Sequence, residues 1–410
     1  MSTSSLVTSR LAVGAHRSWQ DARLLARAEG ENARDLRRLD ILPIAAAHGR
    51  TLAHDLFALA DLPGVSSSAM DGWAIGGTGP WRLGEPIRAG DPAPREALEP
   101  GTARAIATGA PVPPGTAAVL RSEDGDTRYA DGATLLHLRE PGDAPRDGRH
   151  VRLAGEEVRR GEPILPAGTV LTSPRLALLA VAGFDEVSVV GTPAVDLVLL
   201  GDELRSTGLP ADGEIRDAFL PALPAAILGA GGRHAGTRFG RDSHDATVAA
   251  LRDTSAPLVV STGGTARGPA DFVRSALDAI GAQITCDGVA VRPGHPVIMA
   301  RLDGGRLFLG LPGNPLAAML IFASLGSPLL AGMTGRAAPR TAPVTLGTRI
   351  ANASASTRLV PCTVDERGAI PTGWQGTAML RGLAAADAVV VIPAGGAESG
   401  TVVETLALPW

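Results

Sequence analysis

The 410-residue chain contains no lysine, so all 38 of its basic residues are arginine. A protein without lysine has no amine side chain to serve as a nucleophile, a Schiff base or a phosphate-binding cation. Any anion that this protein binds through a side-chain cation must therefore meet arginine or histidine.

Cysteine and aromatic residues are also scarce. The two cysteines, Cys286 and Cys362, lie far apart and lack metal-ligand spacing, which predicts a reduced, cytoplasmic protein without disulfides. Aromatic residues make up 3% of the chain, which argues against platforms for base stacking. The net charge of -4 gives no reason to expect nucleic acid or an acidic membrane as a partner, so we expect small-molecule ligands.

One stretch of the sequence carries no charge over a length that could span a bilayer. It covers residues 307–335, but prolines and glycines interrupt it repeatedly, which favours a buried core helix over a membrane span. The first 19 residues lack the continuous apolar core of a secretory signal. The sequence therefore predicts neither a secretory signal nor a membrane segment.

The two ends of the chain and its second quarter show different patterns. Residues 18–50 combine apolar residues at helical spacing with many charges, which predicts one or two amphipathic helices. Short apolar runs separated by glycine, proline and aspartate predict an all-β region over 78–150. A helix is expected at Ser173 to Ala182, with Ser173 as its N-cap. The tail at 336–410 returns to short strands, which indicates a C-terminal β domain.

The middle of the chain alternates between strands and helices. Strands are expected at 193–204, 256–264 and 306–313, and helices at 243–253 and 271–282. This alternation is typical of a parallel sheet that is covered on both faces.

Each of these strands runs into a glycine-containing loop, and ligands of such sheets bind beyond the carboxyl ends of the strands. Glycines let phosphate oxygens approach the backbone, while Asp202 and Asp271 are candidates for a divalent cation beside that phosphate. Pro315 suits the first turn of a helix, whose N-terminus favours an oxyanion. The alternative for each acid is a helix cap or a surface salt bridge. The three loops are Gly201-Asp202-Glu203, Thr262-Gly263-Gly264-Thr265 and Pro312-Gly313-Asn314-Pro315.

A fourth segment, 290–299, places Arg292 and His295 three residues apart around a Pro-Gly turn. An arginine and a titratable histidine near anion-binding glycines predict a second, oxyanion subsite.

Six motifs of the chain, in this order, resemble those of the molybdopterin molybdenumtransferase family. The most specific is LPGVSSSAMDGWA at 62–74, and the resemblance runs from about residue 18 to 408. The other five are TGAPVPPG (108–115), GEEVRRGEPIL (155–165), GDEL (201–204), RPGHP (292–296) and LPGNP (311–315).

The resemblance implies a multidomain α/β plus β fold with a central doubly wound parallel sheet, an inserted β domain and a C-terminal β barrel. It implies an N-terminal helical and extended domain at 1–59 and 151–190, and the inserted domain at 60–150. The molybdopterin-binding α/β domain is expected at 191–336 and the barrel at 337–410. It also implies an elongated homodimer whose active site combines two subunits.

The implied reaction is the insertion of molybdenum from molybdate into adenylylated molybdopterin, with Mg²⁺ as cofactor and release of AMP. Catalytic roles fall on Asp71, Asp202 and Asp271, of which Asp202 and Asp271 would also bind the metal. Asp71 and Thr108 would come from the partner subunit. Thr108, Gly201, Glu203, Thr262 to Thr265 and Pro312 to Pro315 would contact the substrate, and Arg292, His295 and Thr377 would line the molybdate subsite.

This chain departs from the family pattern at several positions. Arg292 and His295 stand where the family usually has lysines, Leu199-Leu200 replaces hydroxyl residues, and Thr377-Ala378 replaces a Ser-Gly pair. These changes leave a second hypothesis open, a non-catalytic paralogue that binds the pterin or cofactor as a carrier or scaffold. A third is an adenylyltransferase or nucleotide-processing enzyme that shares only the central domain.

Overall fold

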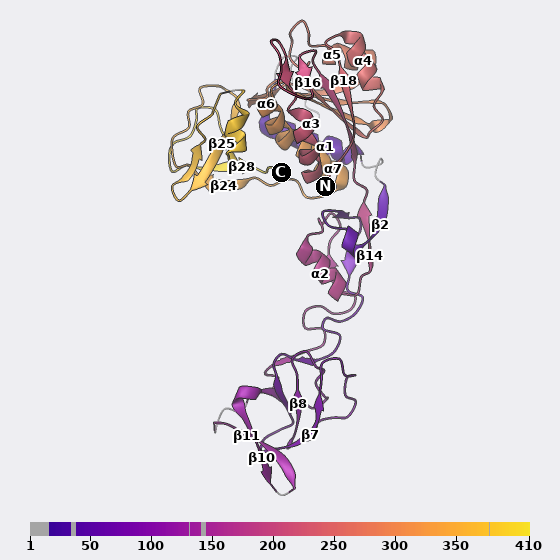
Figure 1. Ribbon diagram of the computed structural model, residues 1–410, viewed down its shortest axis with the longest axis vertical. Helices are drawn as coiled ribbons and strands as arrows, with labels where there is room; N and C mark the ends of the chain where they lie inside the picture. The colour runs from indigo at the N-terminus through magenta and orange to yellow at the C-terminus, as the bar shows by residue number, and fades with distance from the viewer. Residues whose placement is uncertain (1–15, 34–37, 131, 141–144, 377) are drawn as a thin grey trace, which may run out of the picture.

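The computed structural model describes residues 16–33, 38–130, 132–140, 145–376 and 378–410. The molecule is elongated (Figure 1). A body at one end holds a central sheet and the C-terminal strands, a small three-stranded sheet lies midway, and a six-stranded sheet forms the far end.

The central sheet has six strands, and those that carry the predicted loops lie in its middle. Four neighbouring strands are parallel, as the alternating pattern predicts, and two antiparallel strands extend one edge. The sequence did not reveal these two, which need no crossover helix because antiparallel neighbours can be joined by a short connection. In sheet order the strands are β18 (Arg233–Gly240), β15 (Ala194–Leu200), β19 (Leu258–Thr262), β23 (Leu307–Leu311), β22 (Ile298–Arg301) and β20 (Gln283–Asp287).

Helices cover both faces of the central sheet. One face packs against α4 (His244–Arg252) and α5 (Val273–Ala279), the two helices predicted there. The other face packs against α3 (Phe219–Gly229) and a long helix of three segments. These segments are α6 (Pro315–Ile321), the π-helix η6 (Phe322–Gly326) and α7 (Ser327–Thr334).

The long helix is apolar enough to cross a membrane by length and composition, with a mean hydropathy of 1.8 over residues 315–334. In the protein 94% of that window is buried, so it is a core helix, as its prolines and glycines predict. The helix α1 (Trp19–Asn32) packs closely against it, since a Cβ on Gly30 would lie 2.0 Å from the Leu329 carbonyl oxygen.

The described part of the segment 18–50 holds one α-helix and a short 3-10 helix at Ile44–Ala46. After α1, residues Leu39–Pro43 form the strand β2, because the segment pairs antiparallel with β14 (Glu186–Val190). The prediction of one or two helices is thus confirmed with one α-helix, and residues 39–43 form a strand because tertiary strand pairing overrides the local spacing there. The strand β3 (Thr51–Leu52) completes this three-stranded sheet, and α2 (Ser173–Val181) packs beside it. The N-cap of α2 is Thr172 rather than Ser173, and its side chain makes no capping hydrogen bond.

The far end of the molecule is all β, as predicted for this region. Two short strand pairs lead toward it: β4 (Leu56–Phe57) with β13 (Pro163–Leu165), and β5 (Ser67–Ser68) with β12 (Val151–Arg152). The six strands are, in sheet order, β10 (Gly125–Ala130), β11 (Ala133–Leu138), β7 (Trp81–Ile87), β8 (Thr102–Ile106), β6 (Gly72–Ile75) and β9 (Ala118–Arg121).

The C-terminal strands curl into a barrel-like sheet. They are β24 (Ala342–Thr345), β25 (Thr357–Asp365), β26 (Gly368–Pro371), β27 (Ala388–Ile392) and β28 (Val402–Leu406), with the short helix α8 (Leu380–Ala384) beside them. Two strands from elsewhere in the chain extend this sheet, β21 (Val289–Arg292) and β1 (Arg17–Ser18). The sheet therefore joins the C-terminal strands to the segment that carries Arg292.

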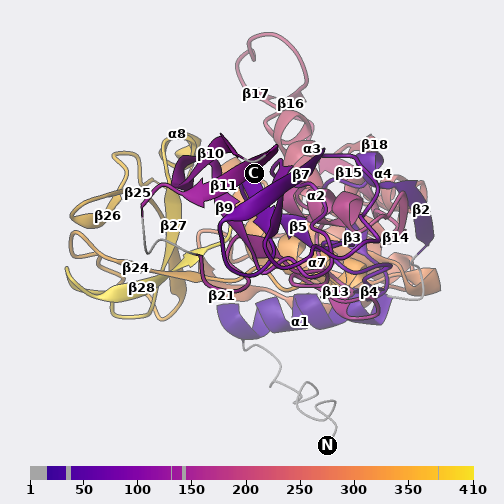
Figure 2. The same cartoon turned by 90° about the horizontal axis from the view of Figure 1, so that it is seen from below.

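A two-stranded loop stands out from the central body. It consists of β16 (Leu204–Arg205) and β17 (Ile215–Arg216), and Figure 2 shows it projecting from the rest of the molecule. Its base follows directly after Glu203, at the carboxyl edge of the central sheet.

Candidate functional site

The three predicted loops meet at the carboxyl edge of the central sheet. There they line a cavity of about 250 Å³, which we call the carboxyl-edge cavity. Loop residues in its lining are Gly201, Glu203, Gly263, Gly264, Thr265 and Gly313, joined by Asp242, Asp271, Phe219 and Pro296. The convergence follows from topology, since parallel neighbours β15, β19 and β23 end at the same edge.

Glycine is required at two positions of this cavity. Gly201 has φ 142°, and a Cβ there would lie 2.7 Å from the Glu203 carboxylate, which folds back over it. Gly263 has φ 81°, and a Cβ there would lie 2.9 Å from the Leu200 carbonyl oxygen. The N–H groups of Gly264 and Gly313 donate to no acceptor within the described part of the chain, so both are available to a ligand oxygen.

Three carboxylates line the carboxyl-edge cavity: Glu203, Asp242 and Asp271. Asp271 accepts a hydrogen bond of 2.5 Å from the Gly268 N–H, which shapes the loop before α5. Asp242 accepts from the Asp202 N–H at 3.3 Å. Carboxylate oxygens suit Mg²⁺, which usually takes one or two carboxylates together with substrate phosphates. No three acidic, histidine or cysteine residues of the described ranges lie close enough to form a metal centre on their own.

Asp202 itself does not line the cavity. Its side chain is 58% exposed and lies 3.6 Å from Arg241 Nε, so Asp242 occupies the place at the lining where Asp202 was expected. Sequence analysis missed Asp242 because it did not identify β18. The signal was present, since Gly240-Arg241-Asp242 ends a strand as Gly201-Asp202 does.

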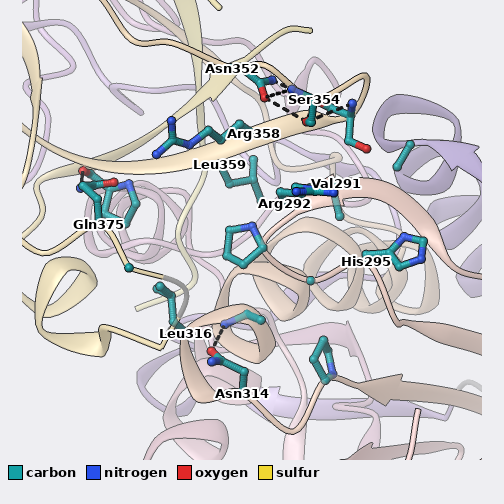
Figure 3. Close-up of a pocket in the computed structure, with 18 of the residues that line it drawn as sticks. Val291, Arg292, His295, Asn314, Leu316, Asn352, Ser354, Arg358, Leu359 and Gln375 are labelled. Carbon is teal, nitrogen blue, oxygen red and sulfur yellow. Dashed lines mark hydrogen bonds between the residues drawn. The ribbon is translucent and has the colours of Figure 1, made fainter. Parts of the chain in front are cut away.

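A larger cavity of about 760 Å³ lies between the central body and the C-terminal strands (Figure 3), and we call it the interdomain cavity. It adjoins the carboxyl-edge cavity, because Pro296 lines both and the turn at 312–314 contributes to each. Its other lining residues include Arg292, His295, Asn352, Ser354, Arg358 and Gln375.

Two arginines stand side by side in the interdomain cavity. Arg292 on β21 is in register with Arg358 on β25, since the two strands pair in parallel. Arg358 donates to the Ala351 carbonyl at 2.6 Å, whereas the side chain of Arg292 has no partner within the described residues. Both arginines line the interdomain cavity near the turn at 312–314, and guanidinium groups beside a helix start are a suitable environment for an oxyanion.

His295 lies on the other side of Arg292 from Arg358 in the view of Figure 3. Its Nδ1 lies 3.0 Å from the Val289 carbonyl oxygen. Because a carbonyl oxygen only accepts, Nδ1 carries the hydrogen of this hydrogen bond. The ring packs edge-on against His16 with the ring centroids 4.2 Å apart. The polar residues that the C-terminal strands contribute were missed by sequence analysis, although the Asn-Ala-Ser-Ala-Ser run at 352–356 is a polar loop before a strand.

Two predicted contact residues of the central domain, Thr262 and Pro315, do not line either cavity. Thr262 is fully buried at the end of β19, and its Oγ1 has no hydrogen-bond partner. Pro315 is the first residue of α6, and the neighbouring Asn314 caps this helix by accepting from the Ala317 N–H at 3.0 Å. Pro312 and Asn314 line the interdomain cavity as expected, whereas Thr377 lies outside the described residues.

Asp71 and Thr108 lie in the far β region, at the opposite end of the molecule from the central sheet (Figure 1). They contact each other: Asp71 Oδ1 accepts from the Thr108 N–H at 2.7 Å and from its hydroxyl at 3.1 Å. Within one chain these residues do not reach either cavity.

Three family models match successive parts of the chain. The MoeA N-terminal region, domains I and II, matches residues 18–183, a probable molybdopterin-binding domain matches 196–332, and the MoeA C-terminal region, domain IV, matches 343–408. The match outside the central domain counts against the hypothesis that only the central domain is shared. Together the matches define a protein of the MoeA class.

Curated relatives of this chain are named molybdopterin molybdenumtransferase. A molybdopterin molybdenumtransferase of Haemophilus influenzae is 30% identical over 72% of this chain and 73% of its own length. Another of Nostoc sp. is 30% identical over 73% of this chain and 70% of its own length. The chain belongs to the molybdopterin molybdenumtransferase family, and nothing in these matches favours the hypothesis of a non-catalytic carrier.

Solved structures agree on the fold. The molybdopterin biosynthesis moeA protein from Pyrococcus horikoshii OT3 has a TM-score of 0.75 and 22% identity, and the match covers 96% of this chain and 100% of that one. A molybdenum cofactor biosynthesis protein from Pyrococcus furiosus has a TM-score of 0.59 and 17% identity, over 95% of this chain and 99% of that one. The overall arrangement is therefore that of MoeA proteins.

Proposed function

We propose that this protein inserts molybdenum from molybdate into adenylylated molybdopterin, with Mg²⁺ as cofactor and AMP as the second product. The observation that carries the proposal is the adjacency of two unlike cavities. The carboxyl-edge cavity offers glycine N–H groups and carboxylates, and the interdomain cavity offers Arg292 and Arg358. A substrate with a phosphoanhydride at one end and a metal-accepting dithiolene at the other needs both environments.

The carboxyl-edge cavity suits the phosphoanhydride. The free N–H groups of Gly264 and Gly313 are placed for phosphate oxygens, and Glu203, Asp242 and Asp271 supply oxygen ligands for Mg²⁺. Mg²⁺ supplies charge neutralisation when the bond between the two phosphates breaks. Asp271 is held by the Gly268 N–H, so its free carboxylate oxygen keeps one orientation.

The interdomain cavity suits molybdate, a tetrahedral dianion. Arg292 and Arg358 donate charge-assisted hydrogen bonds, which are about twice as strong as neutral ones. Because the chain contains no lysine, Arg292 takes the role that the resemblance gives to a lysine at this position. Pro296 and the turn at 312–314 border both cavities, which supports binding of this oxyanion next to the phosphate end of the substrate.

A second copy of the chain completes the site in this proposal. Asp71 and Thr108 are already joined by two hydrogen bonds but sit at the far end of the molecule, where a partner's body can reach them. The strand β2 exposes the apolar side chains of Leu39 and Ile41, which a homodimer interface would bury.

The reaction is tested by incubating the purified protein with adenylylated molybdopterin, Mg²⁺ and molybdate and measuring AMP. We expect molybdate-dependent release of AMP that stops when Mg²⁺ is chelated. Binding of the pterin without release of AMP at any molybdate concentration would overturn the proposed reaction.

The shared site is tested separately by mixing two inactive variants, Asp71→Asn and Asp271→Asn, under conditions that exchange subunits. A mixed dimer has one site in which both residues are intact, so we expect the mixture to regain activity that neither variant has. A mixture as inactive as its components would remove the proposal that two subunits form one site.

A further inference from the structure

A third cavity lies at the other end of the central sheet, where the parallel strands begin. It has a volume of about 480 Å³ and is lined by Arg38, Asp40, Arg50 and Arg233, together with residues 191–194, Ala33, Pro257 and Met333. Arg38, Asp40 and Arg50 belong to the segments around β2 and β3, whereas Arg233 opens β18. This hinge cavity therefore sits between the central sheet and the small sheet that leads to the far β region.

A fourth cavity of about 320 Å³ adjoins the hinge cavity, since Arg50 and Thr192 line both. Its lining adds Arg336 and His48 and no carboxylate. The two cavities together are thus lined by four guanidinium groups and, among the described residues, by the single carboxylate of Asp40.

That carboxylate is already engaged. Asp40 Oδ2 accepts from Arg50 Nη2 at 2.6 Å, and the same Nη2 also lies 3.2 Å from the Val190 carbonyl oxygen. Arg50 is therefore neutralised and held in place. The remaining guanidinium groups have no acid to balance them in the lining.

The surroundings of Arg336 destabilise the charged form of its guanidinium. It donates only to neutral acceptors, the Thr51 hydroxyl at 3.3 Å and the Gly49 carbonyl at 3.0 Å. Burial lowers the pKa of its guanidinium below the ordinary value. A cation buried without a counter-charge gains more from an anion than an exposed one does.

Arg38 and Arg233 are the two available cations of the hinge cavity. Both side chains are exposed, and neither donates to a partner within the described part of the chain. They belong to opposite sides of the hinge: the Arg38 carbonyl accepts from the Gly191 N–H at 2.6 Å, and the Arg233 N–H donates to the Pro193 carbonyl at 2.8 Å. Only Thr192 separates Gly191 from Pro193 in the sequence, so the two arginines are held near one another.

We propose that the hinge cavity is a binding site for a phosphorylated small molecule, distinct from the catalytic site at the opposite edge of the sheet. Arg38 and Arg233 grip the phosphoryl oxygens from the two sides of the hinge, and Arg336 adds positive charge from the adjoining cavity. A volume of about 480 Å³ accommodates a ligand up to the size of a nucleotide. The bound anion fixes the central sheet relative to the small sheet, and with it the direction of the far β region.

The test uses the full-length protein and inorganic pyrophosphate as the probe. Isothermal titration is done on Arg292→Ala protein, which weakens anion binding at the interdomain cavity, and on the same protein with Arg38→Ala and Arg233→Ala added. We expect pyrophosphate affinity to fall by roughly tenfold for each hinge arginine removed. Pyrophosphate is also expected to raise the melting temperature only where the hinge arginines are present.

Arg128→Ala in the same background is the matched control, because Arg128 is exposed on β10 and has no side-chain partner among the described residues. Arg128→Ala removes one positive charge, as each hinge variant does, at a position outside the four cavities. The pyrophosphate affinity should therefore change by less than twofold. Arg38→Gln with Arg233→Gln serves as a second variant pair if the alanine pair unfolds. Equal affinity with and without the hinge arginines, or an equal loss in Arg128→Ala, would overturn the proposal.

Discussion

The two edges of the central sheet carry opposite charge. Its carboxyl edge gathers Glu203, Asp242 and Asp271 around glycines, whereas its amino edge gathers Arg38, Arg50 and Arg233. An acidic, glycine-rich cavity takes a phosphate only when a divalent cation comes with it, while an arginine-lined cavity takes the anion directly. In the two proposals made above, one sheet therefore holds phosphate in two different ways, and only the carboxyl edge does so next to an oxyanion subsite.

The largest effect is expected when a carboxylate is removed from the carboxyl edge of the sheet. Asp271→Asn keeps an acceptor for the Gly268 N–H but removes the charge, so the loop stays in place while the metal site is weakened. We expect kcat for AMP release to fall by roughly two orders of magnitude with little change in melting temperature. A rate like that of the unaltered protein would mean that Asp271 only caps its loop.

Arg292→Ala tests the oxyanion subsite beside the acidic edge. Loss of one charge-assisted hydrogen bond of about 1.5 to 3 kcal/mol raises the molybdate requirement by roughly one to two decades. The measurement is AMP release across a series of molybdate concentrations. Arg128→Ala is the control for charge, and a molybdate dependence that Arg292→Ala leaves unchanged would assign the subsite to other residues.

Gly191→Ala disturbs the amino edge alone. A Cβ at Gly191 would lie 2.7 Å from the Arg38 carbonyl oxygen, which is backbone and cannot yield easily. We expect a loss of about 1 to 3 kcal/mol in the free energy of unfolding, measured as a shift of the denaturation midpoint. Gly373→Ala is the control, since nothing lies within 4 Å of its Cβ position. Similar midpoints for both variants would show that the hinge backbone tolerates the side chain.

The smallest effect concerns acid stability at the carboxyl edge. Arg274 donates to Asp287 and also bonds the Ala266 carbonyl, and this hydrogen-bonded ion pair holds the pKa of Asp287 below its ordinary value. A carboxyl whose pKa is lowered by folding stabilises the protein above its unfolded pKa, near 4, and loses that contribution as pH falls further.

Asp287 is only partly buried, so its contribution is discounted to well under 1 kcal/mol. Asp287→Asn should therefore lower stability slightly at pH 7, and the difference from the unaltered protein should shrink as pH falls below the unfolded pKa of the carboxyl. Asp212→Asn, an exposed position without a partner among the described residues, is the control. A difference that does not shrink with acidification would mean that the ion pair is not its cause.

Local patterns were enough to predict the strands that build the site. The loops after β15, β19 and β23 could be placed together because hydrophobic runs that end in glycine indicate parallel strands. Glycine is needed at Gly201 and Gly263 because both have a positive φ and little space for a Cβ. The strand β2 could not be predicted, because its partner β14 lies more than 140 residues further along.

The side chains that complete the site depend on contacts that no local pattern encodes. Arg358 reaches Arg292 only because β21 joins the C-terminal sheet, and Asp242 replaces Asp202 only because of the turn that follows β18. Asp71 was predicted to act from a partner, and its position at the far end of one chain is compatible with that. The domain boundaries and the roles of individual residues remain predictions.

The far β region is attached to the rest of the protein through two strands that run side by side. Ala58 donates to the Glu162 carbonyl at 2.8 Å and accepts from the Gly161 N–H at 2.9 Å, so the outgoing and returning chains are already hydrogen-bonded neighbours. A tight turn is all that is needed to join them. An internal deletion of residues 59–160 would therefore join chain ends that already lie together and would remove no residue from the lining of the four cavities.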